Sequence, residues 1–187
     1  LNSTKAKWVG KSLKKMQWIN APAYHLKSKL VAMGADEARI DVFQYGVETE
    51  HLRAMCSQKM HEKRVFVSNR NWQALYRIPL LVEAFLTWQA TSPDDSELWV
   101  FGGGSSNDAQ SIDNVIKRYD PSLQNKVNII GYMPKQEMLS KIAAAHFFVS
   151  IPVRDGTPLS LLEAMTLRLF PIVSDIDANH EWLDDRS

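Results

Sequence analysis

Residues 149–166, VSIPVRDGTPLSLLEAMT, contain the end of an apolar strand, a polar turn and the start of a helix. The run AAHFFVSI, which ends at Ile151, is typical of a strand buried on both faces of a parallel sheet. Thr157 is a good N-cap and the proline after it suits the first helical position, so a helix is expected from about Leu159. The free N–H groups at such a helix start, here those of Leu159 and Ser160, favour an anion. The stretch therefore predicts a phosphate-binding corner.

Two carboxylates frame this corner. Asp155 lies in the turn, and Glu163 lies one turn into the helix among apolar neighbours. Because side chains on a helix lean toward its N-terminus, Glu163 should reach toward whatever binds there. A carboxylate does not bind phosphate, but it accepts charge-assisted hydrogen bonds from the hydroxyls of an adjoining sugar. The alternatives are a solvated residue on an amphipathic helix for Glu163 and a turn-forming Asp-Gly pair for Asp155.

From residue 64 onward, apolar strands alternate with amphipathic helices, which predicts an α/β fold with a doubly wound parallel sheet. One helix should place Ile78, Val82, Phe85 and Leu86 on a single face, and another should begin at Pro134. Ligands of such sheets bind beyond the carboxyl ends of the strands, so residues directly after the strands are candidates for a site. The strands are expected at residues 64–68, 98–101, 127–130, 147–151 and 171–174.

Arginines and glycines follow the first two of these strands. Arg70 is the second residue after the strand at 64–68 and Arg77 follows nearby, and a guanidinium suits the geometry of phosphate. Gly103 is the middle glycine of GGGSSN, where the backbone can approach a ligand closely. This run fits the dinucleotide fingerprint G-x-G-x-x-G poorly. The alternatives are surface arginines at the end of the sheet and a plain tight turn.

A pair of aspartates, Asp175 and Asp177, follows the last expected strand. Taken alone, D-x-D suggests carboxylates that hold a divalent ion on a diphosphate. Its position after PIVS, at the end of a late strand, favours a turn and a cap over a metal site. The five histidines lie without ligand spacing, and no Ser-His-Asp order indicates a hydrolase.

Length and composition indicate a globular protein. The chain has 187 residues, a hydrophobic content of 45% and a formal net charge of +1. One cysteine, Cys56, excludes an internal disulfide. No apolar run reaches membrane-spanning length and no signal peptide opens the chain, so a cytoplasmic location is expected. A start at Leu1 without methionine suggests a fragment.

The strongest charge asymmetry lies in residues 1–35, which carry seven lysines and no acidic residue. Trp8, Trp18 and Tyr24 lie between the lysines. Such a segment suits contact with anionic lipid or nucleic acid. Of these two partners, peripheral membrane contact is retained and nucleic acid is not expected. The alternative, which the lack of a dense block of lysines favours, is a solvated pair of helices whose aromatic side chains turn into a core.

The run from Asp155 to Glu163, two acids with seven residues between them, is followed by Ala164 and Met165. It resembles the E-x7-E signature of retaining glycosyltransferases with the GT-B fold, in particular family 4. Their pattern reads roughly EG-x-P-x-x-LLEAM-A-x-G-x-P-V-V-x-S, and this chain reads DGTPLSLLEAMTLRLFPIVS. Asp155 stands for the first Glu, and Arg168 stands where the family usually has Gly.

A second resemblance follows the strand at residues 64–68, where the family reads G-R-x-x-x-x-K-G. Arg70 matches the Arg, but Leu75 and Tyr76 occupy the place of the Lys. Arg77 is the only nearby cation in the sequence that could substitute for it.

Two further stretches are similar to the same family. GYMP at residues 131–134 resembles FLG-x-V-P, where backbone groups meet the nucleotide base. Residues 39–48 resemble the passage from the N-terminal to the C-terminal domain. The resemblance implies that residues 1–45 end an N-terminal acceptor domain, 46–63 form an interdomain linker, and 64–187 form an incomplete nucleotide-sugar-binding domain.

The resemblance also implies a function. The protein is expected to move a sugar from a nucleotide-diphosphate sugar to a hydroxyl of a saccharide or lipid-linked acceptor, with retention, without a cofactor or metal, and in polysaccharide or glycolipid biosynthesis. This chain alone is expected to be inactive. The catalytic candidates are Asp155, for the transferred sugar, Glu163, for the ribose, and Arg70, for the diphosphate. The donor-binding candidates are Arg70, Arg77, Gly103, Tyr132, Met133, Gly156, Thr157, Leu159, Ser160 and Glu163.

Two other classes of function fit parts of the pattern. A nucleotide-sugar epimerase of GT-B fold would share the sheet and the diphosphate site, and product analysis without an acceptor separates it from a transferase. A non-catalytic binding or scaffold module, inactive because the Lys and Gly positions have changed, would use the basic opening segment to bind a partner. Failure of the complete protein to bind any nucleotide would favour the scaffold.

Overall fold

The computed structural model of this chain describes residues 3–56 and 62–183. They form two compact units. Unit 1 comprises the described parts of Leu1–Gly46, Arg154–Pro158 and Asp175–Ser187, and unit 2 those of Val47–Val153 and Leu159–Ser174. The sequence analysis assigned residues 154–158 and 175–187 to the C-terminal domain, whereas here their described parts group with the N-terminal segment. Of the expected linker at 46–63, residues 57–61 lie outside the described residues.

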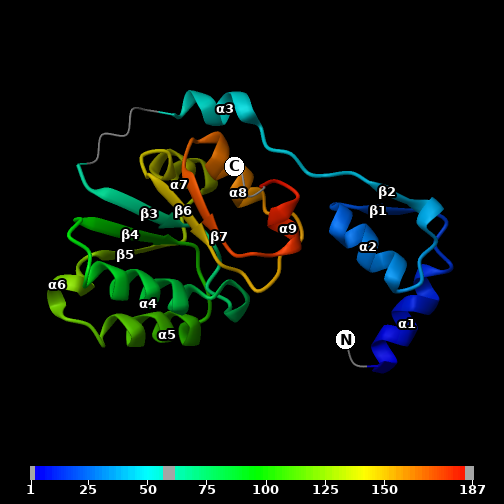
Figure 1. Ribbon diagram of the computed structural model, residues 1–187, viewed down its shortest axis with the longest axis horizontal. Helices are drawn as coiled ribbons and strands as arrows, with labels where there is room; N and C mark the ends of the chain where they lie inside the picture. Colours follow the sequence, from blue (N-terminus) through cyan, green and yellow to red (C-terminus); the bar gives the residue numbers. More distant parts are fainter. Residues whose placement is uncertain (1–2, 57–61, 184–187) are drawn as a thin grey trace. The chain divides into compact units, whose positions relative to one another are not determined.

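Unit 2 is built on the predicted parallel sheet (Figure 1). Its strands run in the order β5-β4-β3-β6-β7, and every neighbouring pair is parallel. Because the order reverses between β3 and β6, the carboxyl ends of these two strands flank the point where such sheets bind ligands. The strands are β3 (Arg64–Ser68), β4 (Ser96–Phe101), β5 (Val127–Gly131), β6 (Phe147–Ser150) and β7 (Phe170–Val173).

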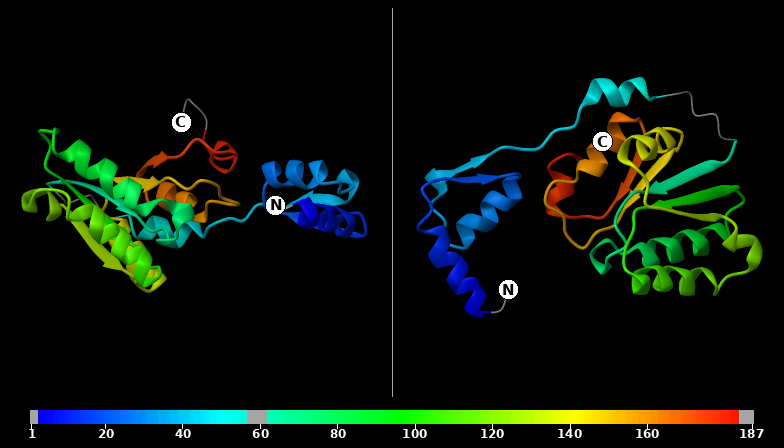
Figure 2. Two further views of the ribbon diagram at one scale, coloured as in Figure 1. Left: turned by 90° about the horizontal axis from the view of Figure 1, so that it is seen from below. Right: turned by 180° about the vertical axis from the view of Figure 1, so that it is seen from behind.

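Helices cover both faces of this sheet (Figures 1 and 2). On one face lie α4 (Ile78–Gln89) and α5 (Ser106–Ile116), and on the other lie α7 (Lys135–Ile142) and α8 (Leu159–Thr166), with α3 (Thr49–Ala54) packed on α8. The connections also contain η2 (Ala74–Tyr76) and α6 (Pro121–Gln124). The prediction of a doubly wound α/β sheet is confirmed.

The core of unit 2 follows the predicted apolar pattern. Ile78, Val82 and Leu86 recur at helical spacing in α4, and all three are 0% exposed. They pack against β4, whose Leu98 and Val100 are also fully buried. Burial of these side chains holds α4 against β4, which is an inner strand of the sheet.

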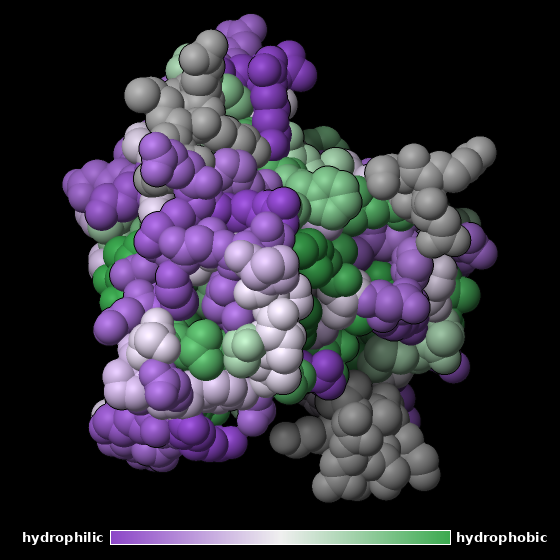
Figure 3. All heavy atoms as spheres, turned by 60° about the vertical axis from the view of Figure 1, so that its left-hand side comes forward, coloured by the Kyte–Doolittle hydropathy of each residue, from purple (hydrophilic) through white to green (hydrophobic). Residues whose placement is uncertain are grey.

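Some large apolar side chains of unit 2 reach the surface. Trp88, Phe170 and Ile172 are among them. On the face shown in Figure 3, apolar residues gather in a band between polar areas. A cavity of about 520 Å³, lined mainly by apolar and aromatic side chains of α4, β3, β6 and β7, lies in this unit. Its lining offers few groups that could bind a polar ligand.

Unit 1 is small and mixed. Its helices are α1 (Ser3–Leu13), α2 (Tyr24–Ala32), η1 (Glu37–Arg39) and α9 (Asp177–His180). Two short strands, β1 (Ile19–Ala21) and β2 (Ile40–Val42), pair in parallel. The buried residues Ala21, Ala35 and Ile40 form its core.

The aromatic residues of the basic segment are exposed. Trp8 is 71% exposed, Trp18 59% and Tyr24 61%. The expectation that these side chains turn into a core is therefore wrong, and the cores of short helices and strands are made here by smaller residues. Residues 1–2 lie outside the described residues. Among the described residues, no helix combines the length and the apolar character needed to cross a membrane.

One carboxylate ties the last described segment into unit 1. Glu181 accepts hydrogen bonds from the backbone N–H groups of Tyr24 (3.1 Å) and His25 (2.8 Å), at the start of α2. Nδ1 of His25 lies 2.5 Å and Nε2 of Gln44 2.8 Å from the same carboxylate. Burial by itself would raise the pKa of Glu181, but these hydrogen bonds outweigh it, and the pKa lies below its ordinary value.

The two units end a helix in the same way with different residues. After α2, the N–H of Gly34 bonds to the carbonyl of Val31, and the N–H of Ala35 to that of Leu30. After α8, the corresponding bonds run from Arg168 to Met165 and from Leu169 to Ala164. Both are Schellman motifs, which need a left-handed residue after the helix. Gly34 has φ 97° and Arg168 φ 61°, so Arg168 adopts the glycine conformation.

Candidate functional site

A polar hollow of about 390 Å³ opens at the carboxyl ends of the strands of unit 2. Its lining comes from the loops after β3, β4 and β5 and from the first turns of α7 and α8. This is the edge at which doubly wound sheets bind ligands. The lining residues are Asn69, Asn71, Gly102, Tyr132, Met133, Lys135, Met138, Leu159, Ser160 and Glu163.

Glu163 is the buried acid of this hollow. Helix α8 begins at Leu159 as predicted, so Glu163 lies one turn in, and Leu161, Leu162 and Ala164 around it are buried. The residue is only 7% exposed, which excludes the alternative of a solvated side chain. Its Oε1 lies 2.6 Å from Nζ of Lys135. A carboxylate in this position can accept hydrogen bonds from ligand hydroxyls, because one exposed ammonium is a partner that a ligand can replace.

The lysine opposite Glu163 comes from a different strand-helix connection. Lys135 is the first residue of α7, which follows β5 through the turn Gly131–Pro134. Its side chain is 68% exposed, whereas that of Glu163 is 9% exposed. The sequence analysis placed only backbone contacts in this turn, and it missed Lys135. A signal was present, since a lysine in the first turn of a helix lies at the unfavourable, positive end of the helix dipole.

Arg70 and Ser160, both predicted site residues, are brought together. Nη1 of Arg70 lies 2.5 Å from Oγ of Ser160, the second residue of α8. The guanidinium also lies 4.3 Å from the centroid of the Tyr76 ring. These contacts fix a cation next to the N-terminus of α8. An anion bound at that helix start would meet Arg70 and the free N–H groups together.

A glycine permits the loop that carries Arg70. A Cβ on Gly102 would lie 2.4 Å from the carbonyl oxygen of Arg70, and Gly102 has φ 93°. A Cβ on Gly103 would meet nothing within 4 Å. Gly103 instead accepts a hydrogen bond from the backbone N–H of Trp72 (2.9 Å). Of the two glycines, Gly102 lines the hollow and Gly103 does not, so the sequence analysis chose the neighbour of the residue that matters.

An unsatisfied polar atom also lies in the lining. Oδ1 of Asn69 is buried and has no hydrogen-bond partner among the described residues. Asn69 follows β3 directly and lines the hollow. Buried side-chain oxygens are usually satisfied, so this atom is a candidate to accept a hydrogen bond from a bound ligand. Asn69 is not among the site residues predicted from the sequence.

The other predicted donor-binding residues divide into two groups. Tyr132, Met133, Leu159 and Ser160 line the hollow, and Tyr132 is 85% exposed there. Arg77 is exposed, does not line the hollow, and precedes α4 with a left-handed backbone (φ 55°).

Three predicted residues belong to unit 1, namely Asp155, Gly156 and Thr157. Oδ1 of Asp155 accepts a hydrogen bond from the N–H of Gly156 (2.8 Å), as expected for the Asp-Gly turn. Oγ1 of Thr157 donates to the carbonyl oxygen of Pro22 (3.0 Å).

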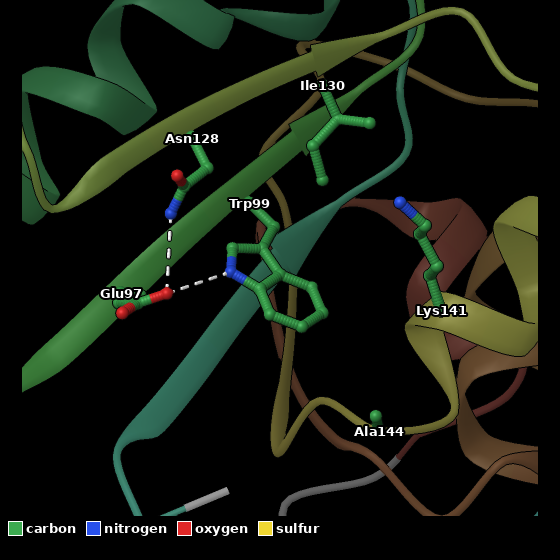
Figure 4. Close-up of a pocket in the computed structure, with 6 residues that line it drawn as sticks. All are labelled: Glu97, Trp99, Asn128, Ile130, Lys141 and Ala144. Carbon is green, nitrogen blue, oxygen red and sulfur yellow. Dashed lines mark hydrogen bonds between the residues drawn. The ribbon is translucent and has the colours of Figure 1, made fainter.

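A second polar pocket, of about 460 Å³, lies over the middle of β4 and β5 (Figure 4). Oε2 of Glu97 accepts hydrogen bonds there from Nε1 of Trp99 (3.2 Å) and Nδ2 of Asn128 (3.3 Å). Lys141, near the end of α7, lies across this pocket from Glu97. Because Glu97 already has these partners and Lys63 (3.3 Å), it is a poorer ligand group than Glu163.

The aspartate pair is engaged within unit 1. Asp177 lies 2.9 Å from Nζ of Lys29, which lowers the pKa of this carboxyl, and Asp175 lies 2.5 Å from Nε2 of His180. Asp177 is the first residue of α9, as its interpretation as part of a turn and helix start expects. Among residues 3–56 and 62–183, no group of three or more His, Cys, Asp or Glu side chains is placed to hold a metal ion.

Comparison with solved structures supports the fold. The chain is similar to Anabaena HepE in complex with UDP-glucose (TM-score 0.79, 12% identity, 98% of this chain and 52% of that one). It is also similar to a glycosyltransferase from Rickettsia africae (TM-score 0.78, 16% identity, 97% and 50%). The chain thus spans about half the length of these proteins. No curated protein matches the sequence significantly.

A family comparison covers most of unit 2. Residues 62–187 match the family model of the glycosyl transferases group 1, which is about two thirds of the chain. The parallel sheet flanked by helices is that of GT-B glycosyltransferase domains, and the resemblance seen in DGTPLSLLEAMTLRLFPIVS is confirmed at this level. The chain belongs to the glycosyl transferases group 1 family.

Proposed function

We propose that this chain binds the nucleotide-sugar donor of a retaining glycosyltransferase. One observation carries the proposal: Glu163, a buried carboxylate, faces a polar hollow at the strand ends beside the N-terminus of α8. A nucleoside diphosphate offers what these groups need, since its ribose donates to a carboxylate and its phosphates suit a helix start and an arginine. HepE, a structural neighbour, binds UDP-glucose.

In this proposal each group has one role. Glu163 accepts hydrogen bonds from the ribose hydroxyls, and Arg70 together with the N–H groups of Leu159 and Ser160 binds the diphosphate. Asp155, eight positions before Glu163, has the role that the family resemblance implies, contact with the transferred sugar. No metal or cofactor is required by this scheme.

The proposed reaction transfers the sugar with its configuration retained. The bond between the anomeric carbon and the phosphate oxygen breaks, the oxygen of an acceptor hydroxyl bonds to the anomeric carbon, and the proton of that hydroxyl passes to the departing phosphate oxygen. The nucleoside diphosphate leaves with the electron pair, and Arg70 and the helix start stabilise the charge that develops on it. The acceptor is a saccharide or a lipid-linked acceptor, in polysaccharide or glycolipid biosynthesis.

Ligand titration tests the proposal. Calorimetry or NMR with GDP, UDP, ADP, dTDP and CMP should show one nucleotide bound by the wild type. Glu163→Ala should weaken this binding by about 10- to 100-fold, the effect of losing charge-assisted hydrogen bonds. Glu137→Ala, at an exposed position in the first turn of α7, is the matched control and should bind like the wild type. If the wild type binds none of the five at millimolar concentration, the proposal is wrong for this chain.

Transfer is expected to need more than this chain. The chain spans about half of its structural neighbours, and the acceptor site is proposed to lie in the other half. Incubating the chain with candidate acceptors and a nucleotide-diphosphate sugar that contains the bound nucleotide should yield no transfer product. Measured turnover by the chain alone would contradict this expectation.

We also propose peripheral contact of unit 1 with anionic lipid on the cytoplasmic face of a membrane. The observation that favours it is the exposure of Trp8, Trp18 and Tyr24 in a segment that has lysines and no acid. Vesicles with 30 mol% phosphatidylglycerol should co-sediment with the chain, whereas pure phosphatidylcholine vesicles should not. Replacing Trp8 and Trp18 with Ala should weaken this binding, and equal binding to both kinds of vesicle would contradict the proposal.

A further inference from the structure

The diphosphate site of this protein lacks one cation at the position where related sequences have it. Leu75 and Tyr76 occupy the place of the lysine that follows the arginine in the family pattern. The substitute indicated by the sequence was Arg77, which is exposed. Neither Arg70 nor Arg77 is among the residues that line the hollow, but Arg70 contacts Ser160 at the start of α8. A bound diphosphate would then meet Arg70 as its only arginine or lysine from the loop after β3. The question is which group supplies the second positive charge.

Lys135 lies where that charge is needed. It is the one cation among the described residues that line the hollow. Its Nζ lies 2.6 Å from Oε1 of Glu163, which places the ammonium inside reach of a ligand held at the first turn of α8. Lys135 and Arg70 come from different strand ends. Lys135 lies in the first turn of α7, which follows β5, whereas Arg70 follows β3, and β4 lies between these two strands.

Two charged residues of the hollow, Lys135 and Glu163, pair with each other. Lys135 and Glu163 together carry no net charge, and only one of the two side chains is buried. Lys135 is 68% exposed, so its ammonium can turn to another partner and remain solvated. Glu163 cannot lose its partner cheaply, since an unpaired buried carboxylate is unfavourable.

A nucleoside diphosphate gives both Glu163 and Lys135 a new partner. Its ribose hydroxyls can donate to Glu163, and its phosphates can accept from Lys135. Neither half of the ligand does this alone: a nucleoside displaces Lys135 without giving it a partner, and pyrophosphate removes Lys135 without giving Glu163 one. We propose that Lys135 moves from Glu163 to the diphosphate when the donor binds, and so replaces the lysine missing after β3. This inference rests on the proposed function and names a further residue of the same site.

The ratio of two affinities separates this role from a structural one. The probes are UDP and uridine, or the corresponding pair for whichever of the five nucleotides the wild type binds. Lys135→Met should weaken UDP binding about 10-fold or more, the effect of one charge-assisted hydrogen bond, while uridine binding stays equal or becomes tighter. Lys135→Arg should keep most of the affinity for UDP, because it keeps the charge.

Lys141→Met is the matched control, because Lys141 lies on the same helix and lines the other pocket (Figure 4). It should leave both affinities unchanged, and circular dichroism should show that all variants are folded. If Lys135→Met weakens the binding of UDP and of uridine by the same factor, Lys135 only positions Glu163. If it weakens neither, Lys135 has no part in binding. In both cases the inference is wrong while the proposed function stands. If the wild type binds no nucleotide, the proposed function fails and the role of Lys135 fails with it.

Discussion

The two units use a carboxylate of low exposure in opposite ways. Glu181 of unit 1 is partly buried and is satisfied by the chain itself, with two backbone N–H groups, an imidazole and an amide around it. Glu163 of unit 2 is buried, but its partner is one exposed lysine in an open hollow. A carboxylate whose acceptor sites are filled stabilises a fold, whereas one with capacity left is available to a ligand. The number and exposure of the partners, more than burial, therefore distinguish the two roles.

The residues that close a helix also differ between the two units. Unit 1 closes α2 with Gly34, which adopts a positive φ without strain, and unit 2 closes α8 with Arg168 at φ 61°. Unit 1 thus has the stabilising choice in both comparisons, namely a fully hydrogen-bonded carboxylate and a glycine at the helix end. Unit 2 departs from these choices in the helix that carries Glu163. Departures of this kind are expected where a sequence serves function as well as folding.

The largest expected effect is on the stability of unit 1. Glu181→Ala leaves the N–H groups of Tyr24 and His25 without their acceptor and should lower the free energy of unfolding by about 2–4 kcal/mol. Hydrogen exchange should show the loss of protection in α2 and not in the sheet of unit 2. Glu37→Ala, which removes an exposed acid of the same unit, is the control and should cost less than about 0.5 kcal/mol. Equal effects of the two variants would contradict the role given to Glu181.

The pH dependence of unit 1 should have the same origin. Because the pKa of Glu181 is lowered in the folded state, its contribution to stability is present above the ordinary value of 4.5 and is lost as the pH falls through the folded value. Protection of α2 against hydrogen exchange should therefore begin to decrease as the solution is acidified below pH 4.5, the ordinary pKa of this group. Glu181→Gln should remove most of this dependence, since it has no proton to bind. A wild-type slope that persists in Glu181→Gln would assign the effect to other groups.

The fold was largely predictable because the strands of unit 2 are short apolar runs. Each predicted strand lies within two residues of its observed bounds, and α8 begins at Leu159 as its Thr-Pro start indicates. These features are local in sequence, since burial on both faces and helix capping need only neighbouring residues. Glu163 was found for the same reason, because its apolar neighbours indicated burial.

The rest of the candidate site was not predictable from local pattern. Lys135 and Glu163 lie 28 positions apart and meet only because α7 and α8 start at the same edge of the sheet. Arg77 looked like the missing cation because it is near Arg70 in sequence, but it lies before α4 in a left-handed conformation. The grouping of residues 175–183 with unit 1 depends on Glu181, whose partners are more than 130 positions away.

A smaller effect tests the helix ends. Arg168→Gly should raise the free energy of unfolding by about 1 kcal/mol, because glycine adopts the positive φ of the Schellman motif without the strain of a side chain. Arg168→Ala is the control, since it removes the same side-chain contacts and keeps the strain. Denaturant unfolding should give Arg168→Gly a free energy of unfolding about 1 kcal/mol higher than that of Arg168→Ala. If Ala is as stable as Gly, the backbone at this position is not strained, and the contrast with Gly34 disappears.

The smallest expected change in stability comes from the residue at the centre of the site. Glu163→Gln keeps the shape of the side chain and leaves behind a lysine that is 68% exposed and can turn to water. The usual cost of breaking a buried pair comes from the buried charge left alone, and here no such charge remains. The free energy of unfolding should therefore change by less than about 0.5 kcal/mol, although nucleotide binding weakens. Denaturant unfolding of Glu163→Gln beside Glu181→Gln tests this, since the same substitution should be nearly neutral in one unit and clearly destabilising in the other. A large loss at Glu163 would mean that its carboxylate serves the fold, and that counting partners does not separate the two acids.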